Sequence, residues 1–420
     1  MKLLSKDIEI GGVSVQKLRE EYGSPLYVYD VARLKENLQE VQDSFLSKYP
    51  KTKAAYAAKA FLCGALVDLL APRGIHLDVV SGGELHLAMA KKFPGERIEF
   101  NGNNKSTEEL VFALRYGVGT IIVDGMDELM LLDLISRELN TEVEVLFRVT
   151  PGVDAHTHEK IKTAKLNSKF GFAMGEVARA LELTVAAPGL HFKGFHCHIG
   201  SQLFEVAPYL EAMEKLRPLF KLVEEITGAP IEELNMGGGF GIRYTTEERK
   251  PLSYFVDPIV EKRSEIFGEE VPVLALEPGR SIVGDAGYSL YTAGTIKRLE
   301  GYPSYLAVDG GMSDNIRPSL YGAEYLAYNA QRPLDEGTEE YTIVGKLCES
   351  GDRLIESQKL PPTESGDLLV MPSTGAYGYS MASNYNGMAI PGVVFVEDGE
   401  AREVVGRQSY EEMYGRDLYL

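Results

Sequence analysis

Several polar residues follow short apolar runs, at places where a strand would end. Lys59 follows the run AYAA, and Glu277 and Arg280 flank a Pro-Gly turn after VLAL. A lysine at the mouth of a folded core loses hydration, which lowers its pKa and makes its amine the nucleophile that a Schiff base requires. Each residue alone also fits a surface lysine or a surface ion pair. The chemistry therefore depends on whether the fold brings these residues together.

Two further motifs admit both a functional and a structural interpretation. His196 and His198 are two residues apart, so they would share one face of a strand, where they could bind a metal or stack on a planar cofactor. A metal site needs more ligands at neighbouring strand ends. No aspartate ends the eighth strand-like run, and Lys59 after the first is not a good ligand, so we expect no metal. Residues 237–241 (GGGFG) could cradle a phosphate with backbone N–H groups, or could be an ordinary glycine turn. Cys348 lies in CESGD, among acidic and glycine residues that are unlike core sequence.

Alternating strand-like and helix-like segments would position these residues. The strand-like runs are at residues 53–58, 75–80, 97–101, 120–124, 143–149, 193–198, 232–236 and 272–277. Amphipathic stretches at 82–92, 107–116, 127–139, 177–186 and 206–227 separate most of them. This alternation predicts βα units with parallel strands. Eight such strands in about 225 residues favour a (β/α)8 TIM barrel of the α/β class over an open doubly wound sheet, and they place the active site at the carboxyl ends of the strands.

The pattern changes after Glu277. Short alternating runs at 288–298, 304–308, 341–347, 367–371 and 393–397 predict a C-terminal antiparallel β-sandwich or β-barrel-like domain. We therefore expect an N-terminal segment (1–25) that joins the β domain, a barrel over 26–277 and the β domain over 278–420. The Lys-rich, non-periodic segment 150–171 is expected to be a barrel loop with a functional role, because long loops in compact domains are seldom idle.

The composition excludes several classes of protein. The 420 residues include 43 Lys and Arg against 62 Asp and Glu, a net charge of −19, which disfavours non-specific binding to nucleic acid or to an anionic membrane. No apolar run approaches the roughly 20 residues that span a bilayer, and the N-terminus becomes charged too soon for a signal peptide. Three cysteines are too few for a disulfide framework. We expect a cytoplasmic protein.

Nine motifs, in order along nearly the whole chain, resemble those of the fold-type III pyridoxal-phosphate-dependent decarboxylases, which have an alanine racemase-like barrel. Within that family they are most similar to the diaminopimelate decarboxylases. The motifs are YAAKA (56–60), PGVDAHTHEKIKT (151–163), SKFG (168–171), HCHIGSQ (196–202), GGGFG (237–241), EPGR (277–280), RPSLYGA (317–323), CESGD (348–352) and GAYGYSMASNYN (375–386).

The resemblance implies a role for each site residue. Lys59 would bind pyridoxal 5′-phosphate (PLP) covalently, His198 would stack on its ring, Glu277 would pair with the ring nitrogen, and Cys348 would donate a proton to the substrate. The other residues implied to bind or lie beside the cofactor are Asp78, Ser201, Gly238, Gly239, Gly279, Arg280 and Tyr377. Those implied to bind the substrate are Arg280, Arg317, Tyr321, Glu349 and Tyr377. In this family the CESGD motif reaches the partner subunit's site, so a homodimer is implied.

The implied reaction is decarboxylation of meso-2,6-diaminopimelate to L-lysine and CO2, the last step of lysine biosynthesis. The distal end of this substrate carries a carboxylate and an amine, which Arg280, Arg317 and Glu349 would match. Sister decarboxylases of ornithine, arginine or carboxynorspermidine are the nearest alternative, although a diamine product would favour acidic residues. A racemase would need a second base. A non-catalytic homologue would be expected to lose Lys59 or the glycine turn. A metal-dependent hydrolase is suggested only by the two histidines.

Overall fold

The computed structural model describes residues 1–4, 6–153 and 168–419. The chain divides into two compact units, which we call the barrel unit and the sheet unit. The barrel unit comprises Leu38–Gly241 and Arg249–Ser281. The sheet unit comprises Met1–Asn37, Ile242–Glu248 and Ile282–Leu420.

Eight parallel strands close the barrel, which confirms the predicted (β/α)8 fold. Their order around the barrel is β10-β11-β12-β5-β6-β7-β8-β9. The strands are β5 (Thr52–Ala57), β6 (His76–Val79), β7 (Ile98–Phe100), β8 (Thr120–Val123), β9 (Val143–Arg148), β10 (Leu190–His196), β11 (Glu233–Asn235) and β12 (Val273–Leu276). Because parallel strands of this kind are covered on both faces, they are short apolar runs, and all four residues of β8 are buried.

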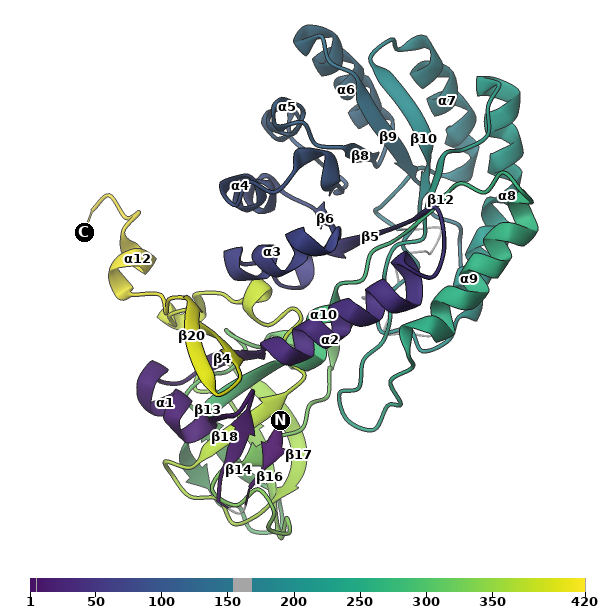
Figure 1. The fold of residues 1–420 in the computed structure, drawn as a ribbon. Coiled ribbons are helices and arrows are strands. Elements are labelled where there is room, and N and C mark those ends of the chain that lie inside the picture. The colour runs from purple at the N-terminus through teal and green to yellow at the C-terminus, as the bar shows by residue number, and fades with distance from the viewer. Residues whose placement is uncertain (5, 154–167, 420) are drawn as a thin grey trace. The chain divides into compact units, whose positions relative to one another are not determined.

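Helices follow the barrel strands β5 to β11 and lie outside them, and one more helix precedes β5 (Figure 1). They are α2 (Val31–Val41), α3 (Gly64–Leu70), α4 (Gly82–Ala90), α5 (Thr107–Tyr116), α6 (Met126–Leu139), α7 (Val177–Ala186), α8 (Ala207–Thr227) and α9 (Leu252–Phe267). Local sequence sets their ends. Helix α5 starts at a capping box between Ser106 and Glu109 and ends at Gly117 with φ of 78°, a left-handed conformation that glycine adopts readily.

The sheet unit contains a nine-stranded sheet with the central order β17-β16-β14-β13-β4-β19-β20, and β18 pairs with β13 and β15. These strands are β4 (Leu26–Asp30), β13 (Gly287–Lys297), β14 (Ser304–Val308), β15 (Tyr328–Asn329), β16 (Glu339–Val344), β17 (Arg353–Leu360), β18 (Leu368–Pro372), β19 (Val393–Glu397) and β20 (Glu400–Val405). The sheet is mixed, not wholly antiparallel, because β14 pairs with β16 and β19 pairs with β4 in parallel.

Shorter elements complete both units. A three-stranded sheet, β1 (Lys2–Leu3), β2 (Ile8–Ile10) and β3 (Val13–Ser14), precedes α1 (Val15–Tyr22). The other short helices are α10 (Arg280–Val283), α11 (Arg317–Tyr321) and α12 (Tyr410–Tyr414).

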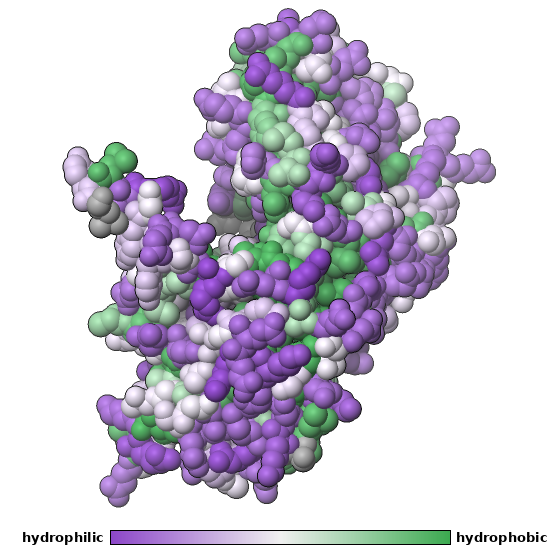
Figure 2. Space-filling model, turned by 60° about the vertical axis from the view of Figure 1, so that its left-hand side comes forward, coloured by the Kyte–Doolittle hydropathy of each residue, from purple (hydrophilic) through white to green (hydrophobic). Residues whose placement is uncertain are grey.

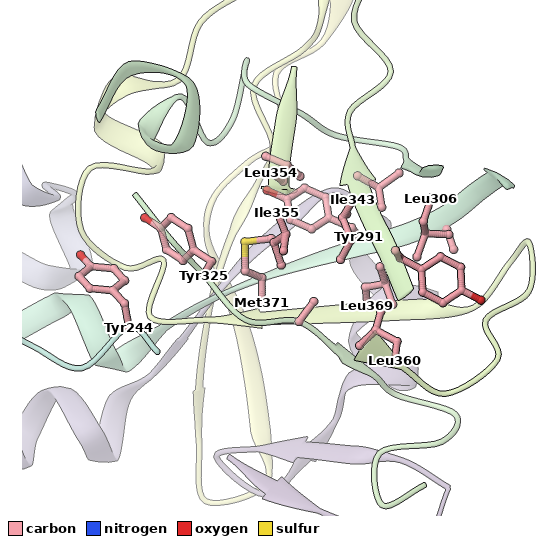
Figure 3. Close-up of a cluster of buried hydrophobic side chains, with 14 of the residues drawn as sticks. Tyr244, Tyr291, Leu306, Tyr325, Ile343, Leu354, Ile355, Leu360, Leu369 and Met371 are labelled. Atoms are coloured by element: carbon pink, nitrogen blue, oxygen red, sulfur yellow. The ribbon is translucent and has the colours of Figure 1, made fainter. Parts of the chain in front are cut away.

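A cluster of buried side chains holds the sheet unit together (Figure 3). It includes Tyr291 of β13, Leu306 of β14, Ile343 of β16 and Leu369 of β18, each with at most 1% of its surface exposed. Burying an aliphatic or aromatic side chain of this size contributes about 1.5 to 3 kcal/mol. These contacts join strands that are distant in sequence and give the functional segments of this unit a rigid base.

The surface carries mostly polar side chains. Figure 2 shows one face, on which hydrophilic residues (purple) predominate and hydrophobic residues (green) form smaller areas between them. Among the helices of the described ranges, none is both long and apolar enough to cross a membrane.

Candidate active site

A cavity of about 390 Å³ lies at the carboxyl ends of the barrel strands. Its polar lining includes Lys59, Asn101, Arg148, His196, His198 and Glu277. Six side chains capable of chemistry thus come from the ends of five strands, as expected for the catalytic end of such a barrel.

Lys59 enters this cavity from a short helix, Ala58–Ala60, directly after β5. Its side chain is 36% exposed, and its Nζ lies 3.5 Å from Oδ2 of the fully buried Asp78 on β6. The other oxygen of Asp78 accepts a hydrogen bond of 2.6 Å from Asn101. Burial and the nearby charge of Glu277 raise the pKa of Asp78 to about 7. Asp78 therefore lies behind the amine of Lys59, where it can hold the lysine in place.

Glu277 follows β12 and is almost completely buried. Its Oε1 lies 3.0 Å from Nε2 of His196 and accepts hydrogen bonds from Asn235 at 2.9 Å and Asn101 at 3.4 Å. Burial alone would raise the pKa of Glu277, but His196 and the positive charge of Lys59 outweigh it, so that its pKa lies far below the ordinary value. The barrel thus holds an ionised carboxylate in its interior beside the lysine.

His198 lies beside the glycine turn. We had expected His198 to lie within a strand together with His196. This was wrong, because strand β10 ends at His196 and His198 lies in the segment after it. Its Nδ1 accepts a hydrogen bond of 3.4 Å from the N–H of Gly238, which leaves the hydrogen of a neutral ring on Nε2. Burial and the positive charges of Lys59 and Arg148 lower the pKa of His198 well below its ordinary value. A neutral, flat ring therefore faces the cavity.

The glycine turn has no space for side chains. A Cβ on Gly238 would lie 2.0 Å from the carbonyl oxygen of Glu277, and a Cβ on Gly239, which has φ of 108°, would lie 2.4 Å from that of Gly200. The carbonyl of Gly238 accepts a hydrogen bond of 2.8 Å from the buried hydroxyl of Tyr209. This packing explains why the turn consists of glycines, and it leaves backbone that a ligand can approach closely.

Arg280 begins α10, next to Gly279. Its side chain is buried, and its Nη2 donates a hydrogen bond of 2.9 Å to Oγ of Ser201. A Cβ on Gly279 would lie 2.9 Å from Cβ of Ala57, in the strand that leads to Lys59. The close approach at Gly279 therefore packs the segment that carries Arg280 against the segment that carries Lys59.

The remaining predicted residues lie in the sheet unit. Arg317 is buried at the start of α11, where its Nη1 donates to the hydroxyl of Tyr244 at 3.0 Å and hydrogen-bonds to Tyr325. Burial would lower the pKa of Arg317, but Tyr325, Tyr244 and Tyr377 raise it. Tyr321 ends the same helix. Arg317 thus stays charged beside the hydroxyls of Tyr244 and Tyr325, and Tyr377 also acts on its charge.

Cys348 and Glu349 project from a turn that is held at several points. The N–H of Cys348 donates a hydrogen bond of 2.7 Å to Oδ1 of Asn386. The buried carboxylate of Asp352 accepts a hydrogen bond of 2.9 Å from the N–H of Leu347. Cys348 and Glu349 are both exposed. Their side chains are therefore accessible on a turn whose backbone is fixed.

Four residues of the site were not among the site residues predicted from the sequence. Asn235, Asn101 and His196 contact Glu277, and Tyr209 supports the glycine turn. Asn101 and His196 had a signal, because Asn101 ends a strand-like run and His196 forms a pair with His198, whereas Asn235 and Tyr209 had none. Residues 154–167, which include most of the predicted 150–171 loop and all but the first three residues of the motif at 151–163, lie outside the described residues.

Comparison with known families agrees with this geometry. Residues 34–284 match the family model described as "Pyridoxal-dependent decarboxylase, pyridoxal binding domain". The chain is 48% identical to the diaminopimelate decarboxylase of Bacillus subtilis (strain 168), with 98% of this chain and 95% of that protein covered. It is 41% identical to the diaminopimelate decarboxylase of Staphylococcus aureus (strain COL), with 98% and 97% covered.

A solved structure has the same fold. The crystal structure of diaminopimelate decarboxylase from M. jannaschii in complex with L-lysine matches with a TM-score of 0.92 and 32% identity, over 100% of this chain and 98% of that one. The sequence similarity extends over both units, and the family model covers the segments that carry Lys59, His198, the glycine turn and Glu277. The chain therefore belongs to the diaminopimelate decarboxylase family of pyridoxal-dependent decarboxylases.

Proposed function

We propose that this protein decarboxylates meso-2,6-diaminopimelate to L-lysine and CO2 with PLP as cofactor. The observation that carries the proposal is the single cavity that contains the amine of Lys59, the ionised carboxylate of Glu277 and the neutral ring of His198. Similarity over the full chain to diaminopimelate decarboxylases, one of them solved with L-lysine, supports the choice of substrate.

The residues of the barrel unit fit PLP in kind. Lys59 supplies an amine for the aldehyde, and the buried carboxylate of Glu277 supplies a partner for the ring nitrogen. The turn at Gly238 and Gly239 has no side chains that would keep a phosphate away from its backbone. We propose that this turn, with Arg280 beside Ser201, binds the phosphate. Arginine and backbone N–H groups are the usual partners of such an anion.

Each residue then has a defined task. Lys59 would hold the cofactor covalently until the amine of the substrate takes its place. Glu277 would keep a proton on the ring nitrogen, and His198 would lie against the ring. PLP would supply an acceptor for the electron pair left on the α-carbon when the bond to the carboxylate breaks and CO2 departs. Cys348 donates its thiol proton to that carbon, which completes the product.

The distal end of the substrate requires both signs of charge. We propose that Arg280, Arg317, Tyr321 and Tyr377 bind its carboxylate and that Glu349 binds its ammonium group. Arginine suits a carboxylate because its planar fork donates two parallel hydrogen bonds. A sister decarboxylase for ornithine, arginine or carboxynorspermidine would gain little from these cations.

We further propose a homodimer in which Cys348 and Glu349 of each subunit complete the active site of the other. The exposed position of both residues on a fixed turn supports this arrangement. Two inactive variants, Lys59→Ala and Cys348→Ala, would test it when mixed. Because half of the mixed dimers would be hybrids with one intact site each, activity should recover to about one quarter of the wild-type level. No recovery after subunit exchange would contradict the shared site.

We also propose that the protein works in the cytoplasm, where its thiols stay reduced. Cys348 is an exposed free cysteine, and its proposed role requires the reduced form. Oxidised glutathione should therefore inactivate the enzyme, and a reductant should restore it. Full activity with Cys348 oxidised would argue against the role of its thiol.

The substrate is tested by CO2 release from the PLP-loaded protein. We expect release from meso-diaminopimelate, with L-lysine as the product, and no comparable release from ornithine, arginine or carboxynorspermidine. Release from a diamine precursor instead would retain the role of Lys59 and refute the assignment of Arg317 and Glu349. Racemisation without CO2 would refute the decarboxylase.

A further inference from the structure

A row of carboxylates and asparagine amides runs through the inside of the barrel. It begins at Asp78, which accepts a hydrogen bond of 2.6 Å from Asn101. Asn101 also donates to Glu277 at 3.4 Å, and Asn235 donates to Glu277 at 2.9 Å. The row ends at Glu99 of β7, whose Oε2 accepts a hydrogen bond of 2.9 Å from the same Asn235 amide. Two amides thus separate three buried carboxylates.

Asn235 uses both hydrogens and the oxygen of its side-chain amide in hydrogen bonds. Its Nδ2 has two hydrogens and donates to the carboxylates of Glu277 and Glu99, both at 2.9 Å. Its Oδ1 accepts a hydrogen bond of 2.9 Å from the N–H of Gly237, the first residue of the glycine turn. Rotating the amide by half a turn would place its oxygen against two carboxylates. The orientation of Asn235 is therefore fixed from both sides.

Glu99 is itself held at the opposite, amino-terminal end of the barrel. Its Oε1 lies 2.6 Å from Nζ of Lys53, which also pairs with Glu233. Burial, opposed by Lys53, raises the pKa of Glu99 to about 8. Lys53, Glu99 and Glu233 line a second cavity, of about 310 Å³. The proposed reaction uses none of these three residues, yet one of them leads through Asn235 to Glu277.

Several charged or titratable groups affect or are affected by the charge of Glu277. They are Lys59, Asp78, Glu99, Arg148, His196, Cys197 and His198, from strands on several sides of the barrel. Asn101 and Asn235 are the amide donors among its partners. Of these two, Asn235 makes the shorter bond, and its oxygen also accepts from the N–H of Gly237, so it connects the Glu277 side chain to the glycine turn. The backbone N–H of Glu277 makes a second link, a hydrogen bond of 2.8 Å to the carbonyl of Gly237.

We propose that Asn235 is a positioning residue, oriented by Glu99 below and by Gly237 beside it, that fixes the Glu277 carboxylate and favours its charged form. This inference rests on the proposed role of Glu277 as the partner of the PLP ring nitrogen. It links the two ends of the cofactor site, because one amide holds both the carboxylate for the ring and the turn for the phosphate.

Asn235→Leu tests the proposal, because it keeps the volume and removes the amide. Loss of a hydrogen bond to a charged group should weaken PLP binding about 10-fold or more. Without this amide, Glu277 should hold the proton of the ring nitrogen less strongly. Because the ring nitrogen and the imine nitrogen titrate together, the alkaline transition in the visible absorbance of bound PLP should shift by about one pH unit. The KM for diaminopimelate should stay the same, because Asn235 does not line the cavity that contains Lys59.

Matched variants separate positioning from general destabilisation. Asn329 is also a buried amide, and it donates to Thr363 and Asp367 in the sheet unit, so Asn329→Leu should lower stability and leave the absorbance transition unchanged. Glu99→Gln keeps an oxygen for Asn235 and should bind PLP within about twofold of the wild type. If Asn235→Leu does not fold, Asn235→Ser, whose hydroxyl can donate to only one carboxylate, should shift the transition in the same direction.

Three results would overturn the proposal. The first is a folded Asn235 variant whose absorbance transition and PLP affinity are both unchanged. The second is an absorbance shift in Asn329→Leu equal to that in Asn235→Leu. The third is an absorbance shift of that size in Glu99→Gln, which would assign the effect to the charge of Glu99. The absorbance titration requires bound PLP but no turnover. A holoenzyme that releases no CO2 from diaminopimelate would therefore refute the proposed function separately from this test.

Discussion

Replacing Gly238 by alanine tests the glycine turn most sharply. The new Cβ would lie 2.0 Å from the carbonyl oxygen of Glu277, whereas ordinary contacts begin at 3.4 Å, so the backbone must move by about 1.4 Å or the neighbouring strand end must yield. Overpacking of this kind costs about 1 to 3 kcal/mol. If the turn relaxes in the free protein and must be restored when PLP binds, the Kd for PLP should rise about 5- to 150-fold.

Gly175→Ala is the matched control. Gly175 lies in the same unit, in the short helix Met174–Glu176, and a Cβ there would meet nothing within 4 Å. We expect its PLP affinity to equal that of the wild type. The assay is titration of the apoprotein with PLP by visible absorbance, and circular dichroism confirms that each variant is folded. A folded Gly238→Ala variant with wild-type affinity would refute the assignment of the turn to the cofactor.

Three further predictions concern single side chains. The pKa of Asp78 is raised to about 7, so the folded protein holds a proton that the unfolded chain releases near pH 4, and stability should fall as the pH rises between these values. Thermal unfolding of the apoprotein should therefore show a smaller difference in melting temperature between pH 5 and pH 8 in Asp78→Asn than in the wild type. An unchanged difference would contradict this. Arg317→Lys loses the planar guanidinium that lies between Tyr244 and Tyr325 and should raise the KM for diaminopimelate about 10-fold at unchanged PLP affinity. An unchanged KM in steady-state kinetics would remove Arg317 from the substrate site. Asp285→Asn breaks the 2.7 Å ion pair with Arg33 and should lower the free energy of unfolding in urea by about 1 kcal/mol or less, with no change in kcat. A changed kcat would contradict the purely structural role of this pair.

The sequence predicted the barrel well because each barrel strand is a short apolar run with polar residues or turns beside it. All eight strands begin and end within three residues of the predicted positions. The edges of the sheet unit were not predictable in this way. Strand β17 (RLIESQKL) has mostly charged and polar residues, and half of the residues of β20 (EAREVV) are charged, because much of the length of both strands is exposed. The parallel pairs that make the sheet mixed depend on strand order, which local patterns do not encode.

The site was predictable where it lies at strand ends and unpredictable where it lies inside strands. Lys59, His198 and Glu277 stand out because polar residues after apolar runs have no packing role. Glu99 and Asn235 look like ordinary members of IEF and ELN, and they meet only because the closed barrel brings together residues that are 136 apart in sequence. The clash at Gly238 likewise depends on the path of a strand end 39 residues away.

The central claim is that the cavity around Lys59 is the PLP site, and its most direct test is the position of the covalent bond. Borohydride reduction of the holoenzyme makes the bond between lysine and cofactor permanent, and peptide mass spectrometry then locates it. The account predicts one pyridoxyl group per chain, on Lys59, and none in Lys59→Ala. A label on Lys53, Lys105 or another lysine, or an undiminished label in Lys59→Ala, would contradict it.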